Sequence, residues 1–372
     1  YGARILRGAV YEEFRPERNK NVFWECKNEI GQRRTYHMAP AGLRSPTGVT
    51  AEILRFLRDS AVYSPDLPAQ EFVITVPASF QVAQRNDTFK ACEIAGLDVE
   101  GGGLLDEPVA AFLDYLCTYG DQIAGKLDEP KNLVVFDFGG GTCDVAVFEI
   151  GMDSHSHGLK LAALSVSRYH RLGGGDIDAA ILHDVLVSQL CEQNSLGRHD
   201  LGYEEKRRYV EPALMGAAES LKISLCVEMA RLRKFGKFDG ADKETVGVKL
   251  PGVHQCPVGD AVYALQSPEL SAVAFERVLE PFIDTDLLFT NEGEYHTTCS
   301  IFAPLQDALD RSGIQTDEVD LCLMVGGSSL IPQVVDALGE YLDAAEILVF
   351  PDRESIQTAV ARGAAYHSLA LA

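Results

Sequence analysis

The chain has 372 residues, of which 46% are hydrophobic and 24% are charged, so it is long and apolar enough to bury the cores of two or more domains. Its formal net charge of −22 argues against a nucleic-acid partner, which needs a basic footprint. Because the sequence has no signal peptide, no apolar run of membrane length and no CxxC pair among its nine cysteines, we predict a cytoplasmic protein with free thiols and no membrane partner.

The first part of the chain is predicted to mix short strands with one helix. Residues Val22–Cys26 and Arg34–His37 are expected to pair as strands around a turn at Gly31. Ser45 followed by Pro46 is typical of a helix start, and an apolar stripe follows at helical spacing.

A strand and a helix are predicted next. Glu71–Pro77 reads as a buried strand, and a helix is expected from Ala83 to Ala95. Gly96 is suited to end that helix, because glycine readily adopts the left-handed conformation of a helix C-terminus.

Glu107 lies between the end of a strand and the start of a helix. Pro108 fixes the first turn of a helix predicted over Val109–Tyr115. An acid at this place can simply complement the helix dipole, or it can act on a ligand at the strand exit. Asp106 beside it is the weaker candidate for a chemical role.

The stretch VVFDFGGGTCDVAVFEI, from Val134 to Ile150, predicts a two-stranded hairpin with a glycine tip. Backbone N–H groups can approach an anion closely at Gly139, Gly140 and Gly141, because these residues have no Cβ. Asp137 at the strand end is a candidate ligand for hydrated Mg²⁺, and Thr142 adds a hydroxyl. An ordinary glycine-rich turn is the alternative interpretation of these residues.

The remaining elements follow from the same patterns. We predict a third meander strand at Leu159–Ser167, a glycine loop at Arg171–Asp178 that opens a helix to Leu190, and a long helix at Tyr203–Leu225. A β-arm is expected at Lys234–Gln266 and a further helix at Phe275–Phe289. The last elements are a helix at Ile301–Ser312, a strand at Val319–Val325 followed by a glycine turn and a helix from Pro332, and a C-terminal helix at Ala359–Ala372.

Five segments in this order resemble the ATPase domain of the seventy-kilodalton heat-shock chaperones (DnaK-like), within the actin, sugar-kinase and heat-shock ATPase superfamily. They are FVITVPASFQVAQRNDTFKACEIAGL, LLDEPVAAFLDY, DFGGGTCDVAVF, LGGGDID and LMVGGSSLIPQV. The resemblance implies an α/β, two-lobed actin-like ATPase fold, in which each lobe has a mixed sheet flanked by helices and a smaller outer subdomain. It assigns 1–68 to the outer subdomain of the first lobe and 69–130, completed by 353–372, to the core of that lobe. The core of the second lobe is 131–177, completed by 299–352, and its outer subdomain is 178–298.

The same resemblance implies a site for ATP or ADP with Mg²⁺. Glu107 would orient or deprotonate the attacking water, Asp137 would hold the metal, and Thr142 and Arg4 would assist catalysis, with Arg4 in place of a lysine that reaches the γ-phosphate. Nucleotide contacts are implied for Gly139, Gly140, Gly141, Thr142, Gly173, Gly174, Glu219, Lys222, Cys226, Gly326, Gly327, Ser328 and Asp352. Glu219 and Lys222 would bind ribose hydroxyls.

This chain departs from the family pattern at several places. Ile223 and Leu330 replace two arginines of the adenosine site, which predicts weaker ATP binding or another base preference. The family's first phosphate loop would lie ahead of Tyr1, and we expect it to precede Tyr1 in the full-length protein rather than to have been lost. Residues 353–358 are predicted to be an extra stretch between Asp352 and the last helix.

The predicted function is therefore that of an ATP-hydrolysing chaperone domain whose nucleotide state controls lobe closure. A J-domain co-chaperone and a nucleotide-exchange factor are the implied partners, and the peptide-binding domain is absent from this chain. An actin-like filament subunit, a small-molecule kinase on the same fold and a degenerate nucleotide sensor remain alternatives.

Overall fold

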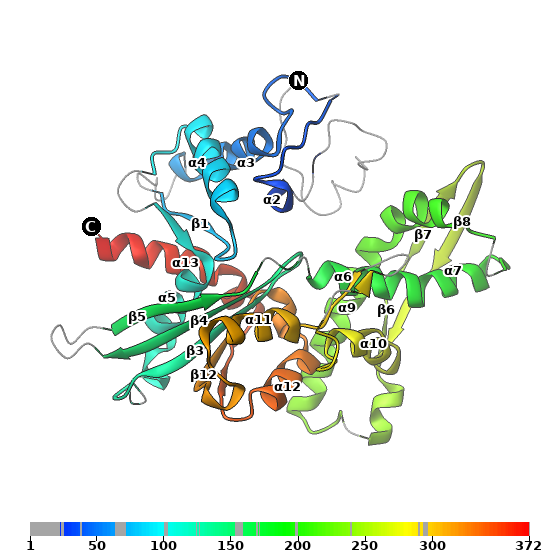
Figure 1. Cartoon of the computed structure of the whole chain (residues 1–372). Helices are drawn as coiled ribbons and strands as arrows, with labels where there is room; N and C mark the ends of the chain where they lie inside the picture. The colour runs from blue at the N-terminus through cyan, green and yellow to red at the C-terminus, as the bar shows by residue number, and fades with distance from the viewer. Residues whose placement is uncertain are drawn as a thin grey trace. The chain divides into compact units, whose positions relative to one another are not determined.

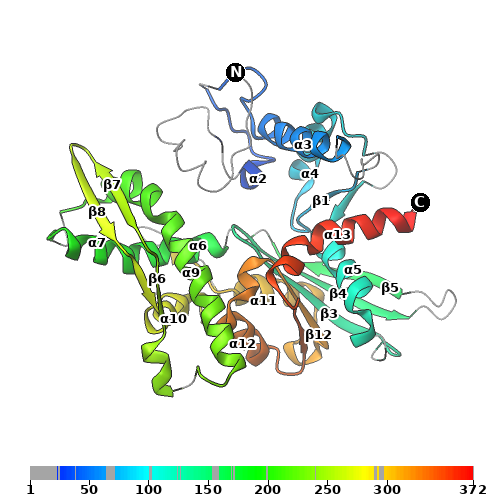
Figure 2. The same cartoon turned by 180° about the vertical axis from the view of Figure 1, so that it is seen from behind.

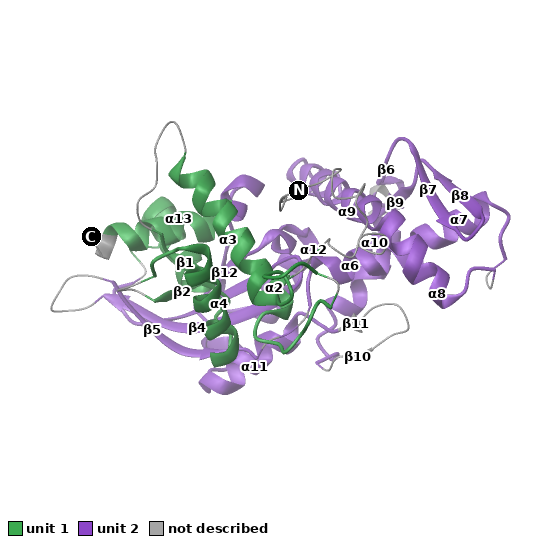
Figure 3. Cartoon of the chain, turned by 90° about the horizontal axis from the view of Figure 1, so that it is seen from above, with its two compact units in different colours: residues 1–125, 358–372 green, residues 126–357 purple. Residues whose placement is uncertain are grey.

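The computed structural model describes residues 23, 26–37, 39–63, 72–99, 103–123, 125, 127–152, 159–168, 170, 172–197, 200–238, 240–288, 291–292 and 297–371. The chain forms two compact units, 1–125 with 358–372 and 126–357 (Figure 3). Arg4 lies outside the described residues.

Unit 1 contains a short parallel strand pair and helices. Its elements are α2 (Cys26–Glu29), α3 (Pro46–Val62), β1 (Ile74–Val76), α4 (Val82–Ala95), β2 (Leu104–Asp106), α5 (Glu107–Tyr119), a 3₁₀ turn (Gly120–Gln122) and most of α13 (Arg353–Leu371). β1 pairs with β2 so that Val76 faces Asp106, and α5 begins directly after this pair. The strand pair therefore fixes where Glu107 leaves the sheet.

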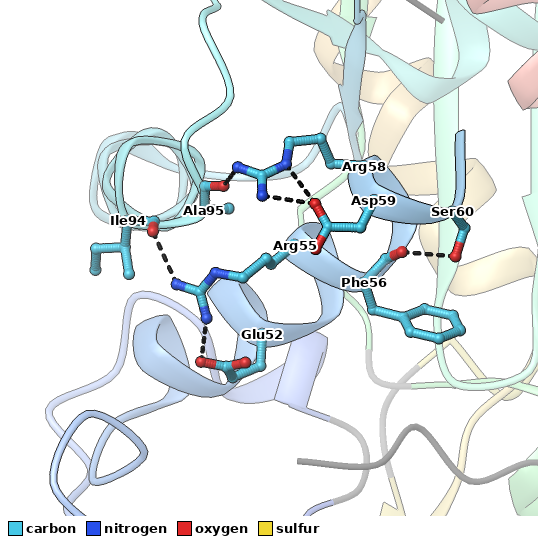
Figure 4. Close-up of polar contacts among 8 residues, drawn as sticks. All are labelled: Glu52, Arg55, Phe56, Arg58, Asp59, Ser60, Ile94 and Ala95. Atoms are coloured by element: carbon cyan, nitrogen blue, oxygen red, sulfur yellow. Dashed lines mark hydrogen bonds and ion pairs between the residues drawn. The ribbon is translucent and has the colours of Figure 1, made fainter. Parts of the chain in front are cut away.

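Helices α3 and α4 are held together by arginine side chains (Figure 4). Ser45 caps α3 by accepting a hydrogen bond from the Gly48 N–H. Arg55 donates to the Ile94 carbonyl over 2.9 Å, and Arg58 donates to the Ala95 carbonyl, so both guanidinium groups satisfy carbonyls in the last turn of α4. Such carbonyls lack partners within their own helix and favour a nearby cation.

The C-terminal helix α13 docks on α5 at very short range. The Arg362 guanidinium donates to both Asp114 carboxylate oxygens, over 2.9 and 2.7 Å, and Asp114 is 0% exposed. A Cβ built on Gly363 would lie 1.7 Å from the Ala110 carbonyl oxygen. Glycine is therefore required where the two helix backbones meet.

Unit 2 is built on a five-stranded mixed sheet, visible from both sides in Figures 1 and 2. The strands are β3 (Lys131–Phe138), β4 (Cys143–Met152), β5 (Leu159–Val166), β12 (Leu321–Val325) and β13 (Glu346–Leu348), in the order β13-β12-β3-β4-β5. β13, β12 and β3 run parallel, whereas β3, β4 and β5 form the predicted antiparallel meander. Helix α11 (Phe302–Ser312) contacts β4 and β5, and α12 (Pro332–Tyr341) contacts β13. This mixed sheet with helices confirms the predicted α/β class.

The rest of unit 2 joins long helices to short strand pairs. Its elements are α6 (Gly174–Ile181), a π-helical turn (Leu182–Leu186), α7 (Val187–Gln193), α8 (Tyr203–Glu205), a second π-helical turn (Lys206–Val210), α9 (Glu211–Lys234), β6 (Gly247–Lys249), β7 (Val253–Val258), β8 (Ala261–Gln266), β9 (Glu269–Ser271), α10 (Ala272–Leu279), β10 (Asn291–Glu292) and β11 (Thr297–Thr298). Short 3₁₀ segments cover Gly240–Thr245, Glu280–Phe282, Thr316–Glu318 and Gly327–Leu330. One continuous hydrophobic core runs from the sheet into this part.

Side-chain amides at the end of α7 bind the backbone of β8. Gln193 Nε2 donates to the Gln266 carbonyl over 3.1 Å, and its Oε1 accepts from the Gln266 N–H over 2.7 Å. Asn194 makes the same pair of bonds to Ala264, over 2.9 and 3.1 Å. Gln189 makes the same pair of bonds to Glu269 of β9, over 2.8 and 3.1 Å. Each carboxamide thus hydrogen-bonds as a backbone peptide group would.

Some predicted elements are wrong. Cys26 begins helix α2 rather than ending a strand, and the described residues 33–37 form no strand. Cys26 and Ile30 are both buried, which is a helical spacing. Helix α13 starts at Arg353, directly after Asp352, whose carboxylate accepts from the Ser355 N–H over 2.8 Å, so 353–358 is no extra stretch before the helix.

The cysteines and the helices can be compared with what the composition predicted. None of the nine cysteines forms a disulfide, and only Cys117 is exposed. Among the described residues, none of the helices combines the length and apolar character that a bilayer crossing requires.

Candidate functional site

The hairpin tip between β3 and β4 presents backbone donors. The Gly139 N–H donates to the Thr142 carbonyl over 3.0 Å, which closes the turn. Within the part of the chain that the structure describes, the N–H groups of Gly140, Gly141 and Thr142 have no acceptor. Successive free N–H groups in a glycine turn are the arrangement that binds anions.

A second glycine loop is fixed to this tip by backbone hydrogen bonds. The Gly174 N–H donates to the Gly139 carbonyl over 3.0 Å, and the Gly175 N–H donates to the Gly140 carbonyl over 2.8 Å. A Cβ on Gly173 would lie 2.5 Å from the Gly140 carbonyl carbon and oxygen. The two loops predicted separately from the sequence therefore form one backbone surface in unit 2.

The turn after β12 joins the same place. Ser328 Oγ donates to the Gly139 carbonyl over 2.9 Å. Gly326 has a φ of +84°, and a Cβ there would lie 2.6 Å from Asp137 Oδ1 and 2.4 Å from the Phe138 carbonyl oxygen. The glycine lets the turn pass beside the Asp137 carboxylate, as only a residue without a side chain can. Gly327 beside it is exposed.

Asp137 has a second acid opposite it. It faces Asp144 across the β3–β4 pair, and residues opposite each other in antiparallel strands point to the same side of the sheet. Asp137 is half-buried and Asp144 is buried. Sequence reasoning missed Asp144, although its place in the alternating pattern after Thr142 was a usable signal.

The donor set fits a hydrated Mg²⁺. The described side chains include no cluster of three or more His, Cys, Asp or Glu residues able to hold a metal ion. Mg²⁺ does not need one, because it binds through one or two carboxylates and keeps waters and substrate phosphates as its other ligands. Asp137 and Asp144 supply carboxylate oxygens as metal ligands, beside free N–H groups that can donate to phosphate. A metal–phosphate complex requires both.

Helix α9 brings a buried cation to the second glycine loop. Lys222 Nζ donates to the Gly174 carbonyl over 2.8 Å and lies 2.8 Å from Asp178 Oδ1. Glu219, one turn earlier, is exposed. Cys226 is buried, and this desolvation raises the pKa of its thiol to about 12. Of the adenosine residues predicted on α9, Lys222 is thus joined to the glycine loop, by contacts that the sequence did not predict.

Burial also acts on the acid of this pair. Desolvation raises the pKa of Asp178 to about 6, with further raising by Glu219 and Asp176, against the lowering effect of Lys222. The folded state therefore holds this proton more tightly than the unfolded chain does. Asp178 favours folding most below its unfolded pKa of 3.8, and this contribution is lost as the pH rises through about 6.

We expect the unfolding free energy of wild type, minus that of Asp178→Asn, to fall between pH 4.5 and pH 7 for this reason. Urea unfolding at several pH values measures the difference. Because other titrating groups are common to both proteins, they cancel in the comparison. A difference that is flat or that rises with pH contradicts the assignment.

Glu107 is placed in unit 1, as the first residue of α5. Its carboxylate accepts hydrogen bonds from Lys27 Nζ over 2.9 and 3.2 Å, and its side chain is 15% exposed. Asp106 is bonded instead to Arg85, over 2.6 Å. Lys27 was not predicted, because nothing in the local sequence links α2 to the start of α5.

Comparisons with known proteins bear on this arrangement. A family model described as Hsp70 protein matches residues 12–245, a range that includes Glu107, both glycine loops and Lys222. The chaperone protein DnaK of Ureaplasma urealyticum serovar 10 is 30% identical over 296 residues, which cover 80% of this chain and 40% of that protein. The chaperone protein DnaK 3 of a Synechococcus species is 30% identical over 323 residues, covering 86% and 41%. The chain spans about two fifths of the length of the curated relatives it matches.

Proposed function

The chain belongs to the Hsp70 family and matches its nucleotide-binding domain, and on this premise we propose that it binds Mg-ATP and hydrolyses it to ADP and phosphate. The observation that carries the proposal is the group of free N–H donors at Gly140, Gly141 and Thr142, on a tip bonded to the second glycine loop. Such a surface suits the terminal phosphates of a nucleotide.

In this proposal Asp137 and Asp144 hold the Mg²⁺ that the phosphates bring with them. When bound, the metal neutralises phosphate charge. Thr142 adds its hydroxyl beside the same tip. Glu219, Cys226, Ile223 and Leu330 would meet the nucleoside.

Glu107 has a separate proposed task. It would accept a hydrogen bond from the attacking water and direct this water at the γ-phosphate. Lys27 fixes the carboxylate in one orientation, since it donates to both oxygens.

The wider role is proposed from family membership alone. Both relatives described above are named as chaperones, and we propose that this chain supplies the ATPase part of such a protein, with nucleotide state controlling lobe closure. A J-domain co-chaperone and a nucleotide-exchange factor would be its partners.

The replacement of Gly140 by alanine tests the phosphate site directly. A Cβ on Gly140 would meet no described atom within 4 Å, and the residue needs no positive φ, so the variant should fold normally. Its methyl group would occupy the space through which an anion reaches the N–H donors, and we expect ATP affinity to fall roughly tenfold or more, which is at least ~1.4 kcal/mol. Calorimetric titration measures this loss.

Gly120→Ala is the matched control, because a Cβ there also meets no described atom within 4 Å. It lies in unit 1, whereas the glycine loops belong to unit 2, and it should leave ATP affinity unchanged. Equal affinity of Gly140→Ala and wild type would contradict the phosphate site.

Asp137→Asn should reveal the metal. The amide is a weaker ligand than the carboxylate, so we expect Mg-ATP affinity to fall by roughly tenfold or more while ATP in the presence of EDTA binds almost as in wild type. Titrations with and without Mg²⁺ give the comparison. A similar loss under both conditions would assign Asp137 a structural role.

A nucleotide sensor with little turnover is the second candidate. It is favoured by Ile223 and Leu330, which are half-buried aliphatic residues where the family has arginines. Tight ATP binding without release of phosphate over many binding lifetimes would select it over the ATPase.

A further inference from the structure

A buried ion pair lies behind the two glycine loops of unit 2. Lys222 on α9 and Asp178 on α6 are 8% and 6% exposed, and their charged atoms lie 2.8 Å apart. Among the described side chains, no other ion pair has both partners so well shielded from water.

The pair is connected to the hairpin tip through a single glycine. Lys222 Nζ donates to the Gly174 carbonyl over 2.8 Å, and the Gly174 N–H donates to the Gly139 carbonyl over 3.0 Å. A Cβ on Gly174 would lie 3.0 Å from Lys222 Nζ and 2.4 Å from Ser328 Oγ. A shift of the ammonium group would therefore move the Gly174 backbone, which is hydrogen-bonded to the hairpin tip at Gly139.

This arrangement gains little in stability from its charges. Two ions lose their hydration on burial, and a well-packed apolar pair of similar size is often equally stable. What the charges do provide is direction, because the Asp178 carboxylate attracts the ammonium group to a position beside the Gly174 carbonyl, to which it donates.

We propose that Asp178 is a positioning residue for the phosphate site: it holds the Lys222 ammonium against the Gly174 carbonyl and so fixes both glycine loops. Lys222 then acts on the phosphates through the backbone instead of contacting the ribose. The effect on ligands rests on the proposed nucleotide binding, whereas the effect on the loops does not.

The first test separates phosphate from ribose. Asp178→Asn and Lys222→Met are titrated with ADP, ATP and adenosine. We expect ADP and ATP affinities to fall about tenfold to 100-fold, as metal affinity does when a residue that orients a metal ligand is lost, while adenosine affinity stays at the wild-type value. An equal loss for adenosine would place Lys222 on the ribose and overturn the proposal.

Asp320→Asn is the control variant for unit 2. Its carboxylate pairs with Lys131 Nζ over 2.8 Å and accepts from the Asn132 N–H, at the end of β3 opposite the tip. It should lower stability without separating ADP from adenosine. If it changes the ADP-to-adenosine affinity ratio as Asp178→Asn does, the effect is general loosening and the proposal fails.

The second test needs no ligand. Amide hydrogen exchange, read at Gly139, Gly174 and Gly175, whose N–H groups donate to backbone carbonyls, should be faster in Asp178→Asn than in wild type, with the exchange of β12 unchanged. Should wild type bind no nucleotide, the proposed function fails while this measurement still decides on the positioning role. Unchanged exchange in both loops overturns it.

A double variant answers the case in which Asp178→Asn does not fold. Asp178→Leu with Lys222→Met replaces the ion pair by an apolar pair, which is expected to restore stability. Its glycine loops should still exchange fast, because no directed donor reaches Gly174. A folded double variant with wild-type protection in the loops would refute the proposal.

Discussion

Glu107→Gln is expected to reduce the rate of ATP hydrolysis by about 10²- to 10⁴-fold while nucleotide affinity stays near the wild-type value. Glutamine keeps the shape of the side chain and an oxygen that can accept from Lys27. It cannot accept a proton, and it orients water less strongly than a charged carboxylate. Single-turnover hydrolysis measures the rate, and calorimetry measures the affinity.

The neighbouring acid supplies the control for this experiment. Asp106→Asn removes a charge one residue away, at the end of β2, where the carboxylate is bonded to Arg85 over 2.6 Å. It should hydrolyse ATP at close to the wild-type rate. A loss of hydrolysis in Asp106→Asn as large as in Glu107→Gln, or a loss of nucleotide binding in Glu107→Gln, would argue that both acids only support the start of α5.

Gly363→Ala is expected to destabilise unit 1 by more than about 3 kcal/mol, beyond the usual cost of overpacking. The added Cβ would lie 1.7 Å from the Ala110 carbonyl oxygen, and backbone atoms cannot move aside as a flexible side chain can. Helix α13 would have to shift along α5 and break the bonds between Arg362 and Asp114. Thermal and urea unfolding measure the loss.

Gly339→Ala is the matched substitution. Gly339 also lies inside a helix, α12, but a Cβ there would be 3.8 Å from the nearest described atom, Ile347 Cγ1, which is an ordinary contact. Because alanine favours helix over glycine, this variant should be as stable as wild type or about 0.5–1 kcal/mol more stable. Equal destabilisation by both substitutions would mean that Gly363 is not required for the close approach of the helices.

Local chemistry made much of the fold predictable from the sequence. Gly96 ends α4 with a φ of +72°, in agreement with its predicted role as a helix stop, and Gly313 ends α11 in the same left-handed conformation, with a φ of +75°. The hairpin around Gly139–Gly141 was equally clear, because alternating apolar residues flank a run of three glycines. In each case the signal lies within a few residues of its effect.

The contacts that shape the site were harder to predict, because they join distant segments. The family pattern predicted Lys222 as a ribose ligand, but nothing in the sequence indicates that Lys222 would form an ion pair with Asp178, 44 positions earlier. Lys27 and Glu107 are 80 residues apart. Long-range pairing of charged side chains depends on packing that no local pattern records, and the family resemblance supplied only the residues that such families share.

The amide bonds between α7 and β8 have a consequence for the behaviour of this chain among its own copies. The edge of an unpaired strand can recruit a strand from another molecule and so begin aggregation. Here the peptide groups of Ala264 and Gln266 on that edge are already occupied by Asn194 and Gln193. The β7–β8 hairpin can therefore extend into solvent without offering this edge of β8 as a template for intermolecular sheet growth.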